Sequence, residues 1–312
     1  MNVVPHTDLR VFPLCLGGNV FGWTATEEDA FAVLDRYADA GGNFIDTADM
    51  YCSWGEGNVG GESEALIGRW MKSRGNRDRM IIATKVAKLE TRPGLSPANI
   101  AAASEDSLRR LQTDRIDLYY AHHDDCEVPL ADSLGAFHAL VRAGKVRYLA
   151  ASNYAADRLR KARDLATEQN LAPYVAVQPE YSLLARAGFE ASLEAVCREE
   201  NLAVFPYWAL ASGYLTGKYR SGPVDSPRAD GVFRYADKPQ AERVLDVLAA
   251  IAKERSLPMA SVALAWCVHH PQIPSVIASA RNVTQLEGLL PMATLTLRAD
   301  EKVRLDEAST GT

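Results

Sequence analysis

Short apolar strands alternate with amphipathic helices along almost the whole sequence, and this alternation limits the possible folds more than any other feature. Eight segments are near-continuous apolar runs, the pattern of parallel strands buried on both faces. Eight parallel strands with intervening helices in about this chain length predict an α/β protein with a (β/α)8 TIM barrel. The predicted strands are residues 13–17, 43–46, 80–86, 116–122, 146–152, 174–178, 203–208 and 273–279.

The helices between these strands are bounded by residues with known capping preferences. Thr26 precedes a helix with an acidic first turn, and Ser96-Pro97 opens another helix. Gly41-Gly42 and Gly144 mark helix ends. We expect residues 2–12 to form an N-terminal β-hairpin. Further helices are predicted near residues 65–71, 130–143, 157–169, 190–200, 240–255, 258–270, 283–290 and 299–309. The long polar stretch at residues 218–240 is a candidate functional loop.

The alternative fold is an open doubly wound sheet that binds a dinucleotide. Such a sheet carries the pattern G-x-G-x-x-G after its first strand. Here the first strand leads into the residues GGNVFG at 17–22, which do not fit that pattern. We therefore predict one barrel domain over residues 1–312, with extra C-terminal helices.

Charge and cysteine content exclude several classes of function. The formal net charge of -6 argues against a nucleic-acid or anionic-membrane surface. Five cysteines without metal-type spacing indicate a reducing compartment. The N-terminal residues lack a basic segment followed by an apolar one, and no apolar run is long enough to span a bilayer. We expect a cytoplasmic protein without a nucleic-acid or membrane partner.

Four polar residues are expected to meet at the carboxyl ends of the strands, where barrels of this type carry their chemistry. Asp46 ends the strand in the stretch NFIDTADMY, and Tyr51 lies in the following loop. Lys85 and His122 each follow their strand's inward-facing residues in steps of two. A buried lysine needs a partner, and Asp46 would supply it. An alternative is that Asp46 and Lys85 are only an ion pair that closes the barrel.

These four side chains have the components of carbonyl reduction by a nicotinamide. A tyrosine hydroxyl with a pKa of about 10 is a weak acid at neutral pH. We expect the Lys85 cation to lower the pKa of Tyr51 and Asp46 to hold Lys85 in place. Tyr51 would then donate a proton to the carbonyl oxygen, which His122 would orient by hydrogen bonding.

The chain resembles the aldo-keto reductases over nearly its full length. The matching pieces are NFIDTADMY, ATK at 83–85, LYYAHH at 118–123, VRAGKVRYLAASNY at 141–154, the strand ending at Gln178, and ALASGYLTGKYR at 209–220. The resemblance implies the (β/α)8 barrel and a catalytic tetrad of Asp46, Tyr51, Lys85 and His122.

The same resemblance implies a set of cofactor-binding residues. Ser152, Asn153 and Gln178 would bind the nicotinamide amide, while Tyr207 would stack on the ring. The turn from Leu210 to Lys218 would wrap the pyrophosphate. Without the other motifs, Ser152-Asn153 could be only a helix cap and Tyr207 a core aromatic. In the wrapping turn, the cofactor-binding residues would be Leu210, Ser212, Leu215, Gly217 and Lys218.

The choice between NADP(H) and NAD(H) depends on the turn before the predicted helix at 283–290. Turns before helices bind anions, and Arg281 can grip a phosphate with two hydrogen bonds. We therefore favour NADP(H), with NAD(H) as the alternative, and count Ser279, Arg281 and Gln285 as cofactor-binding. The sequence departs from the family here and elsewhere: Trp208-Ala209 replaces Ser-Pro, Ser279-Ala280-Arg281 replaces Gly-Ala-Ser, and Gly288-Leu289 replaces the Glu-Asn pair that commonly holds the adenine.

Two further features of the sequence admit other interpretations. The stretch HHDDC at 122–126 has metal-ligand residue types, but adjacent strand residues point to opposite faces, so no metal is predicted. The chain also resembles the potassium-channel β subunits, which share this fold and motif set, so a nicotinamide-binding regulatory subunit is the alternative to a reductase of small aldehydes or ketones. The sequence leaves open the substrate, the physiological direction and the oligomeric state.

Overall fold

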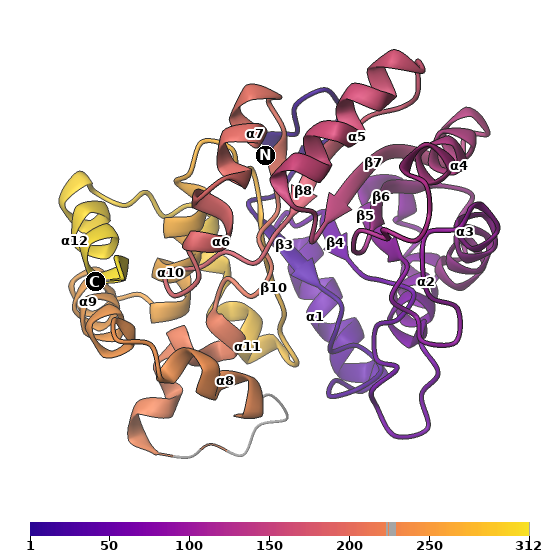
Figure 1. Ribbon diagram of the computed structural model, residues 1–312. Coiled ribbons are helices and arrows are strands. Elements are labelled where there is room, and N and C mark those ends of the chain that lie inside the picture. The colour runs from indigo at the N-terminus through magenta and orange to yellow at the C-terminus, as the bar shows by residue number, and fades with distance from the viewer. Residues whose placement is uncertain (223, 225–228, 312) are drawn as a thin grey trace.

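Eight parallel strands form the centre of the molecule in the computed structural model, which describes residues 1–222, 224 and 229–311. Two backbone hydrogen bonds join the edges of the sheet and close it: Val204 N donates to Gln272 O over 2.8 Å, and Ile277 N donates to Pro206 O over 3.0 Å. The predicted (β/α)8 barrel is confirmed, and helices surround its strands (Figure 1). In sheet order the strands are β10 (Val276–Ala278), β3 (Leu14–Gly17), β4 (Phe44–Asp46), β5 (Ile81–Val86), β6 (Ile116–Ala121), β7 (Val146–Ser152), β8 (Tyr174–Gln178) and β9 (Ala203–Val204).

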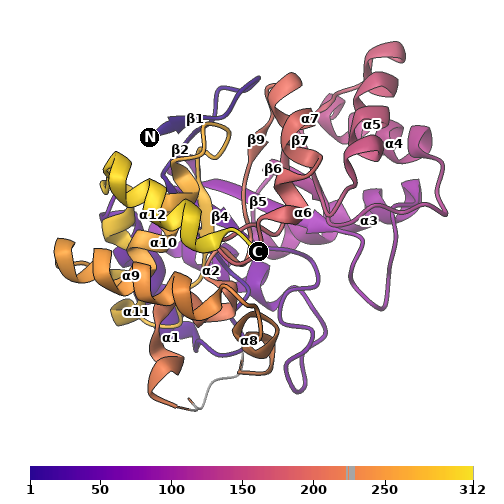
Figure 2. The same ribbon diagram turned by 60° about the vertical axis from the view of Figure 1, so that its left-hand side comes forward.

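The helices follow the strands in the predicted alternation. The Thr26 hydroxyl accepts from Asp29 N and caps the first helix, and the Ser96 hydroxyl caps another by accepting from Asn99 N. Figure 2 shows three C-terminal helices, α9, α10 and α12, on one side of the barrel. Among the described residues no helix is both long and apolar enough to cross a membrane. The helices are α1 (Glu27–Asp39), α2 (Glu62–Arg74), α3 (Pro97–Leu111), α4 (Leu130–Arg142), α5 (Ala156–Glu168), α6 (Ala187–Glu190), α7 (Leu193–Glu199), α8 (Ala229–Ala236), α9 (Ala241–Arg255), α10 (Met259–Val268), α11 (Val283–Glu287) and α12 (Ala299–Ser309).

Several predicted elements have different bounds in the structure. The helix expected at residues 190–200 is two helices, because Ser192 has a non-helical φ of -149° between them. In the strand expected at 203–208, the regular strand pairing ends at Val204. Pro206, two residues further on, has no N–H to donate. The helix expected at 283–290 stops at Glu287. The loop expected at 218–240 contains α8, and its residues 223 and 225–228 lie outside the described residues.

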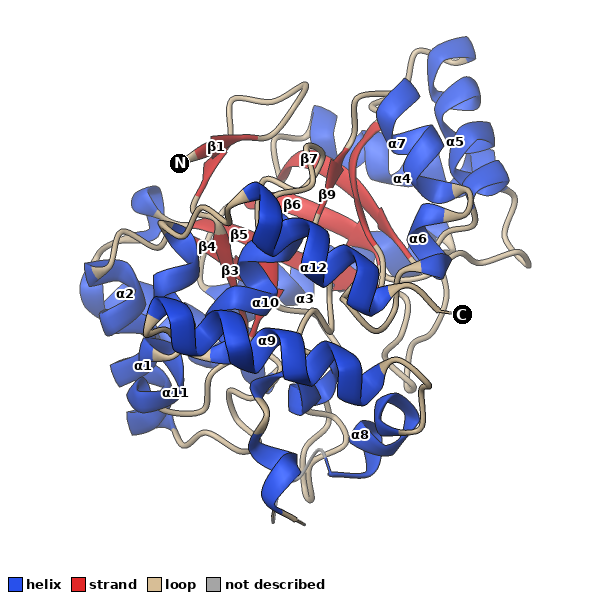
Figure 3. Cartoon of the chain, turned by 90° about the vertical axis from the view of Figure 1, so that its left-hand side faces the viewer, coloured by secondary structure: helices blue, strands red, loops and turns tan. Residues whose placement is uncertain are grey.

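The N-terminal hairpin closes one end of the barrel. Its strands β1 (Asn2–Val3) and β2 (Arg10–Val11) pair antiparallel, as predicted. Val4 and Leu9 are buried in the cluster of residues that fills the barrel interior. Figures 1 and 3 place the hairpin and α8 at opposite ends of the molecule. The open end, where the strands finish, is therefore the end near α8.

The barrel interior explains which side chains reach that open end. Ile81 and Ala83 on β5, like Leu118 and Tyr120 on β6, belong to the inner apolar cluster. Because side chains alternate along a strand, the next inward position on β5 is Lys85. Apolar side chains therefore fill the part of the barrel interior next to the hairpin, and Lys85 and other polar side chains lie at the other end, where the strands finish.

Candidate active site

Lys85 is held by three hydrogen bonds at the open end of the barrel. Its Nζ donates to Asp46 Oδ2 over 2.6 Å, to the Thr47 carbonyl over 2.8 Å and to Tyr51 Oη over 2.9 Å. The Lys85 and Asp46 side chains are 0% and 2% exposed. An ammonium has three donor hydrogens, so Lys85 has no unused donor. Burial lowers the pKa of Lys85, and Asp46 opposes that effect.

Tyr51 lies between this ion pair and the open space above it. Its hydroxyl donates to Asp46 Oδ2 over 3.1 Å, and Lys85 Nζ lies 4.6 Å from the centre of its ring. Burial, followed by the Asp46 charge, raises the pKa of Tyr51 well above its usual value. The predicted lowering of the Tyr51 pKa by Lys85 is therefore wrong for this arrangement. Tyr51 stays protonated at neutral pH, which suits a proton donor.

His122 completes the group of four predicted catalytic side chains. It follows β6, and its backbone N donates to the Val86 carbonyl over 2.9 Å. Burial first, and then the Lys85 charge, lower the pKa of His122 well below its usual value, so the ring is neutral. Its ring centre lies 6.1 Å from that of Tyr51. Within the described part of the chain, the buried Nδ1 has no hydrogen-bond partner.

A cavity of about 630 Å³ opens directly onto these side chains. Asp46, Tyr51 and His122 line it, while Lys85 lies behind Tyr51 and does not. The volume falls in the usual range for small-molecule and cofactor sites. The sequence-based grouping of these four residues thus corresponds to one physical cluster at the floor of a cavity.

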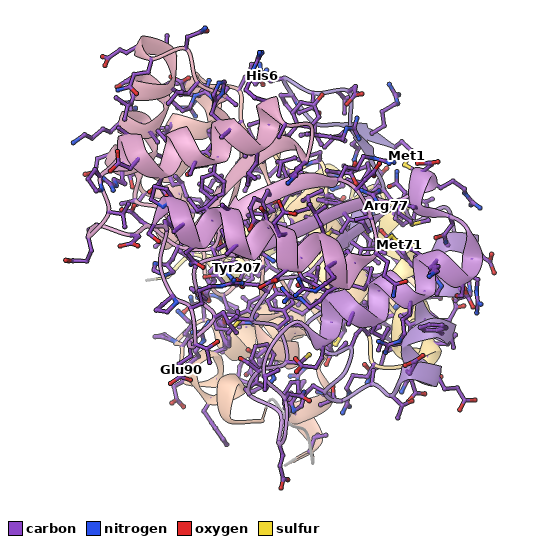
Figure 4. The ribbon with its side chains drawn as sticks, turned by 90° about the vertical axis from the view of Figure 1, so that its right-hand side faces the viewer. Met1, His6, Met71, Arg77, Glu90 and Tyr207 are labelled. Atoms are coloured by element: carbon purple, nitrogen blue, oxygen red, sulfur yellow. The ribbon has the colours of Figure 1, made fainter. Side chains whose placement is uncertain are left out.

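The residues predicted to hold the nicotinamide form a continuous hydrogen-bond chain along the cavity wall. The Tyr207 hydroxyl donates to Asn153 Oδ1 over 2.8 Å, and Asn153 Nδ2 donates to the His122 carbonyl over 2.9 Å. Ser152 Oγ donates to the Gln178 carbonyl, and Gln178 Nε2 donates to Asp46 Oδ1 over 2.9 Å. Figure 4 shows Tyr207 toward the middle of the molecule. This network connects the wall of the cavity directly to Asp46.

The turn after β9 contributes some, but not all, of its predicted residues to the cavity. Leu210, Ser212 and Lys218 line the cavity. Leu215 is instead fully buried in the core, and Gly217 is not among the lining residues. The turn includes the short 3-10 helix at Ala211–Thr216, in which Ser212 has a left-handed φ of 56°.

The turn after β10 places Ser279, Arg281 and Gln285 on the cavity wall. Gln285 Oε1 accepts from Arg281 N over 3.0 Å, and the Ser279 hydroxyl donates to Asn19 Oδ1. Helix α11 has only 5 residues, so its dipole is small and the guanidinium is the main cationic group of this turn. Among the described residues, Arg281 has no carboxylate partner.

Among the cavity-lining residues that the sequence did not predict, four have large aromatic or charged side chains. Trp23 and Trp54 come from loops after β3 and β4, Lys88 follows β5, and Trp208 follows the Tyr207 position. Trp23 and Trp54 pack edge to face with ring centres 5.7 Å apart. Two tryptophans in glycine-containing loops beside predicted strand ends were the available signal, but loop conformation decides whether such residues face a cavity.

The HHDDC stretch has structural partners instead of a shared ligand. Asp124 is paired with Arg158 over 2.9 Å, and the His123 ring nitrogen Nδ1 contacts the Asp124 carbonyl. No cluster of three or more histidine, cysteine or acidic side chains able to hold a metal occurs within the described residues.

Known proteins are similar to this sequence over almost its whole length. A model of the Aldo/keto reductase family matches residues 13–310. An uncharacterised oxidoreductase, YrpG, of Bacillus subtilis is 36% identical, covering 94% of this chain and 90% of that protein. An aryl-alcohol dehydrogenase of Pestalotiopsis microspora is 30% identical, covering 98% and 80%. A probable voltage-gated potassium channel subunit beta of Oryza sativa is also 30% identical, covering 97% and 94%. The barrel, the cavity and these matches together show that the chain belongs to the aldo/keto reductase family.

Proposed function

We propose that this protein reduces aldehydes or ketones to alcohols with NADP(H), using Tyr51 as the proton donor. One observation carries the proposal: the Tyr51 hydroxyl is fixed between Lys85 and Asp46 and faces a cavity beside a neutral His122. Family membership supports an oxidoreductase, and the roles of the individual residues are our proposal.

The cavity fits a nicotinamide dinucleotide by the chemistry of its walls. Lys218 and Arg281 supply cations for phosphate groups, and neither is paired with a carboxylate within the described residues. Asn153 and Gln178 supply amide groups, and Tyr207 supplies an aromatic face. When bound, such a cofactor supplies the hydride that reduces the carbonyl carbon.

The chain's own residues would carry the proton part of the reaction. The Tyr51 O–H bond breaks as its proton moves to the carbonyl oxygen, and the electron pair stays on the tyrosine oxygen. Lys85 stabilises that oxygen through its 2.9 Å hydrogen bond, while Asp46 keeps Lys85 in place. The neutral His122 ring donates an N–H to the same carbonyl oxygen and orients it. Burial and the Asp46 charge raise the pKa of Tyr51, so its hydroxyl holds the proton that carbonyl reduction needs.

The cavity wall near Tyr51 favours aromatic substrates. The Trp54 ring centre lies 6.2 Å from that of Tyr51, and Trp23 packs edge to face against Trp54. Flat aromatic rings prefer such edge-to-face and offset contacts. One relative is named for aryl alcohols, which agrees with this class of substrate.

A nicotinamide-binding regulatory subunit is the second candidate, because one relative is a probable potassium channel subunit beta. Turnover separates the two. A panel of aromatic and aliphatic aldehydes is incubated with the protein and NADPH or NADH. Cofactor oxidation is followed with the protein in excess over the cofactor. The proposal expects NADPH oxidation with aromatic aldehydes. Tight NADPH binding without oxidation by any member of the panel would favour the regulatory role.

A further inference from the structure

Lys88 is a second lysine at the active site, and the backbone turns it toward the cavity. It comes three positions after Lys85, just beyond the end of β5. Ala87 before it has a φ of 116°, a region that side-chain-bearing residues rarely adopt, and it is fully buried. Strained backbone of this kind persists only where the surrounding structure imposes it, often at functional sites. The turn at Ala87 allows Lys88 to line the cavity with Tyr51 and His122.

The Lys88 ammonium differs from Lys85 in having no partner. Within the described residues it forms no ion pair or hydrogen bond, although Glu90 lies only two residues away. Glu90 lies at the periphery of the molecule (Figure 4). Partial burial, with help from Lys85, lowers the pKa of Lys88. Its charge also contributes to the low pKa of His122. A cation in this position gains from any anion that enters the cavity.

The place of Lys88 in the barrel separates it from the cations assigned to the cofactor. Lys218 and Arg281 follow β9 and β10, whose segments lie next to each other where the barrel closes. Lys88 follows β5, which is separated from β10 by β3 and β4 and from β9 by β6, β7 and β8. Lys88 therefore lies across the barrel mouth from the phosphate cations. It is close enough to Lys85 and His122 for their charges to interact, and it lines the same cavity as Tyr51, Trp23 and Trp54.

We propose that Lys88 determines substrate specificity by binding an acidic group of the substrate, so that the preferred substrates are aromatic aldehydes or ketones bearing a carboxylate. The inference rests on the proposed function, because it assumes that the carbonyl meets Tyr51. Lys88 takes no part in the chemical step. It holds the carboxylate while the aromatic ring contacts the tryptophan pair and the carbonyl reaches Tyr51 and His122.

Charge-matched substrates test this role. The substrates are meta- and para-carboxybenzaldehyde and their methyl esters, which differ mainly in charge. The variants are Lys88→Met, Lys88→Arg and Lys161→Met, the last removing an exposed α5 lysine that does not line the cavity. The readout is the ratio of kcat/KM for each acid to kcat/KM for its ester. Using this ratio cancels general losses of activity.

The wild-type protein is expected to prefer at least one acid over its ester. Lys88→Met should lower that preference by roughly twofold to fivefold, mainly through KM, which is the size of a partly exposed ion pair. Lys88→Arg should keep most of the preference, and Lys161→Met should behave as wild type. Added salt should raise KM for the acid and leave KM for the ester unchanged. An equal acid-to-ester ratio in wild type and Lys88→Met would overturn the inference.

Failure of the proposed function gives a different result. If wild type reduces neither acids nor esters, carbonyl reduction itself is in question. Direct calorimetric titration with para-carboxybenzaldehyde and its ester, in the presence of NADPH, then tests Lys88 without turnover. Tighter binding of the acid by wild type, lost in Lys88→Met, supports an acid-binding Lys88. Equal binding of acid and ester by both proteins rejects it.

Discussion

Two groups of cations serve the same cavity, and they differ in how fully they are paired. Lys85, at the floor, makes three hydrogen bonds and is fully buried against Asp46. Lys88, Lys218 and Arg281, on the walls, have no carboxylate partner among the described residues. A paired, dry cation fixes neighbouring groups in place, whereas an unpaired wall cation is suited to an anion brought by a ligand. The floor is therefore organised for chemistry and the walls for binding.

The comparison predicts that the largest loss follows from breaking the floor. Lys85→Met removes the donor to Tyr51 and leaves Asp46 buried without its cation. We expect turnover to fall by about a hundredfold or more. The free energy of unfolding should also drop by about 3–5 kcal/mol, because a buried charge loses its partner. Steady-state kinetics and urea denaturation measure the two effects.

A surface pair is the matched control for this change. Lys145 pairs with Glu105 on the exterior, with side chains 40% and 53% exposed. Lys145→Met should leave turnover near wild type and change stability by less than about 1 kcal/mol. If both lysine variants behaved alike, the distinction between floor and surface ion pairs would be lost.

A wall residue should affect affinity more than chemistry. Tyr207→Ala removes the aromatic face proposed to stack on the nicotinamide, and cofactor affinity should fall by about 1–3 kcal/mol. Tyr207→Phe removes only the hydroxyl that bonds Asn153, so it should keep most of the affinity. Fluorescence titration with NADPH measures both. Unchanged affinity in Tyr207→Ala would place the nicotinamide elsewhere.

Arg281 gives a narrower test of the wall cations. Arg281→Ala should reduce the preference for NADPH over NADH by about tenfold, because a charge-assisted bond to the 2′-phosphate is lost. Arg281→Lys keeps the charge without the two-pronged geometry and should fall between wild type and the alanine variant. Kinetics with both cofactors decide the matter. An unaltered preference in Arg281→Ala removes this residue from phosphate binding.

Asp49 is a buried carboxyl near Lys85 that has no cation partner in the described part of the chain, and its replacement is expected to change stability and not turnover. Both of its carboxylate oxygens are buried without a partner among the described residues, and burial raises the pKa of Asp49 to about 7. Because the folded pKa lies above the unfolded value, the contribution of Asp49 to stability is full at low pH and is lost as pH rises through about 7.

The stability of Asp49→Asn relative to wild type should therefore be higher at pH 9 than at pH 5, by roughly 2–3 kcal/mol. Urea denaturation at the two pH values gives this difference. Asp164→Asn, at an exposed position on α5, is the control and should show no such dependence. Parallel pH profiles for wild type and Asp49→Asn would mean that Asp49 titrates as an ordinary carboxyl.

The same contrast explains which features were predictable from sequence. The two-residue periodicity of β5 and β6 places Lys85 and His122 inward, because strand geometry is regular. The bounds of β7, β8 and α12 were also predicted to the residue. Wall residues depend on loop conformation, so Lys88 and the two tryptophans were missed, and Leu215 was placed on the cavity although it lies in the core.

The direction of the Tyr51 pKa shift could not be read from sequence either. The presence of Lys85 beside a tyrosine favours a lowered pKa, but the balance depends on burial and on the second contact to Asp46. Both of these are properties of the folded chain. The end of α11 was not predictable from sequence either. Gly288 caps the helix, but that position is fixed only by the folded structure around it.

The central claim is that Tyr51 supplies the proton, and Tyr51→Phe tests it most directly. NADPH affinity is measured by fluorescence titration, and reduction of an aromatic aldehyde is measured in a single turnover with the cofactor already bound. We predict near-wild-type affinity together with a loss of roughly a hundredfold or more in the reduction rate, because the ring stays and only the hydroxyl is removed. A reduction rate equal to that of wild type would contradict the account and assign the proton to another group.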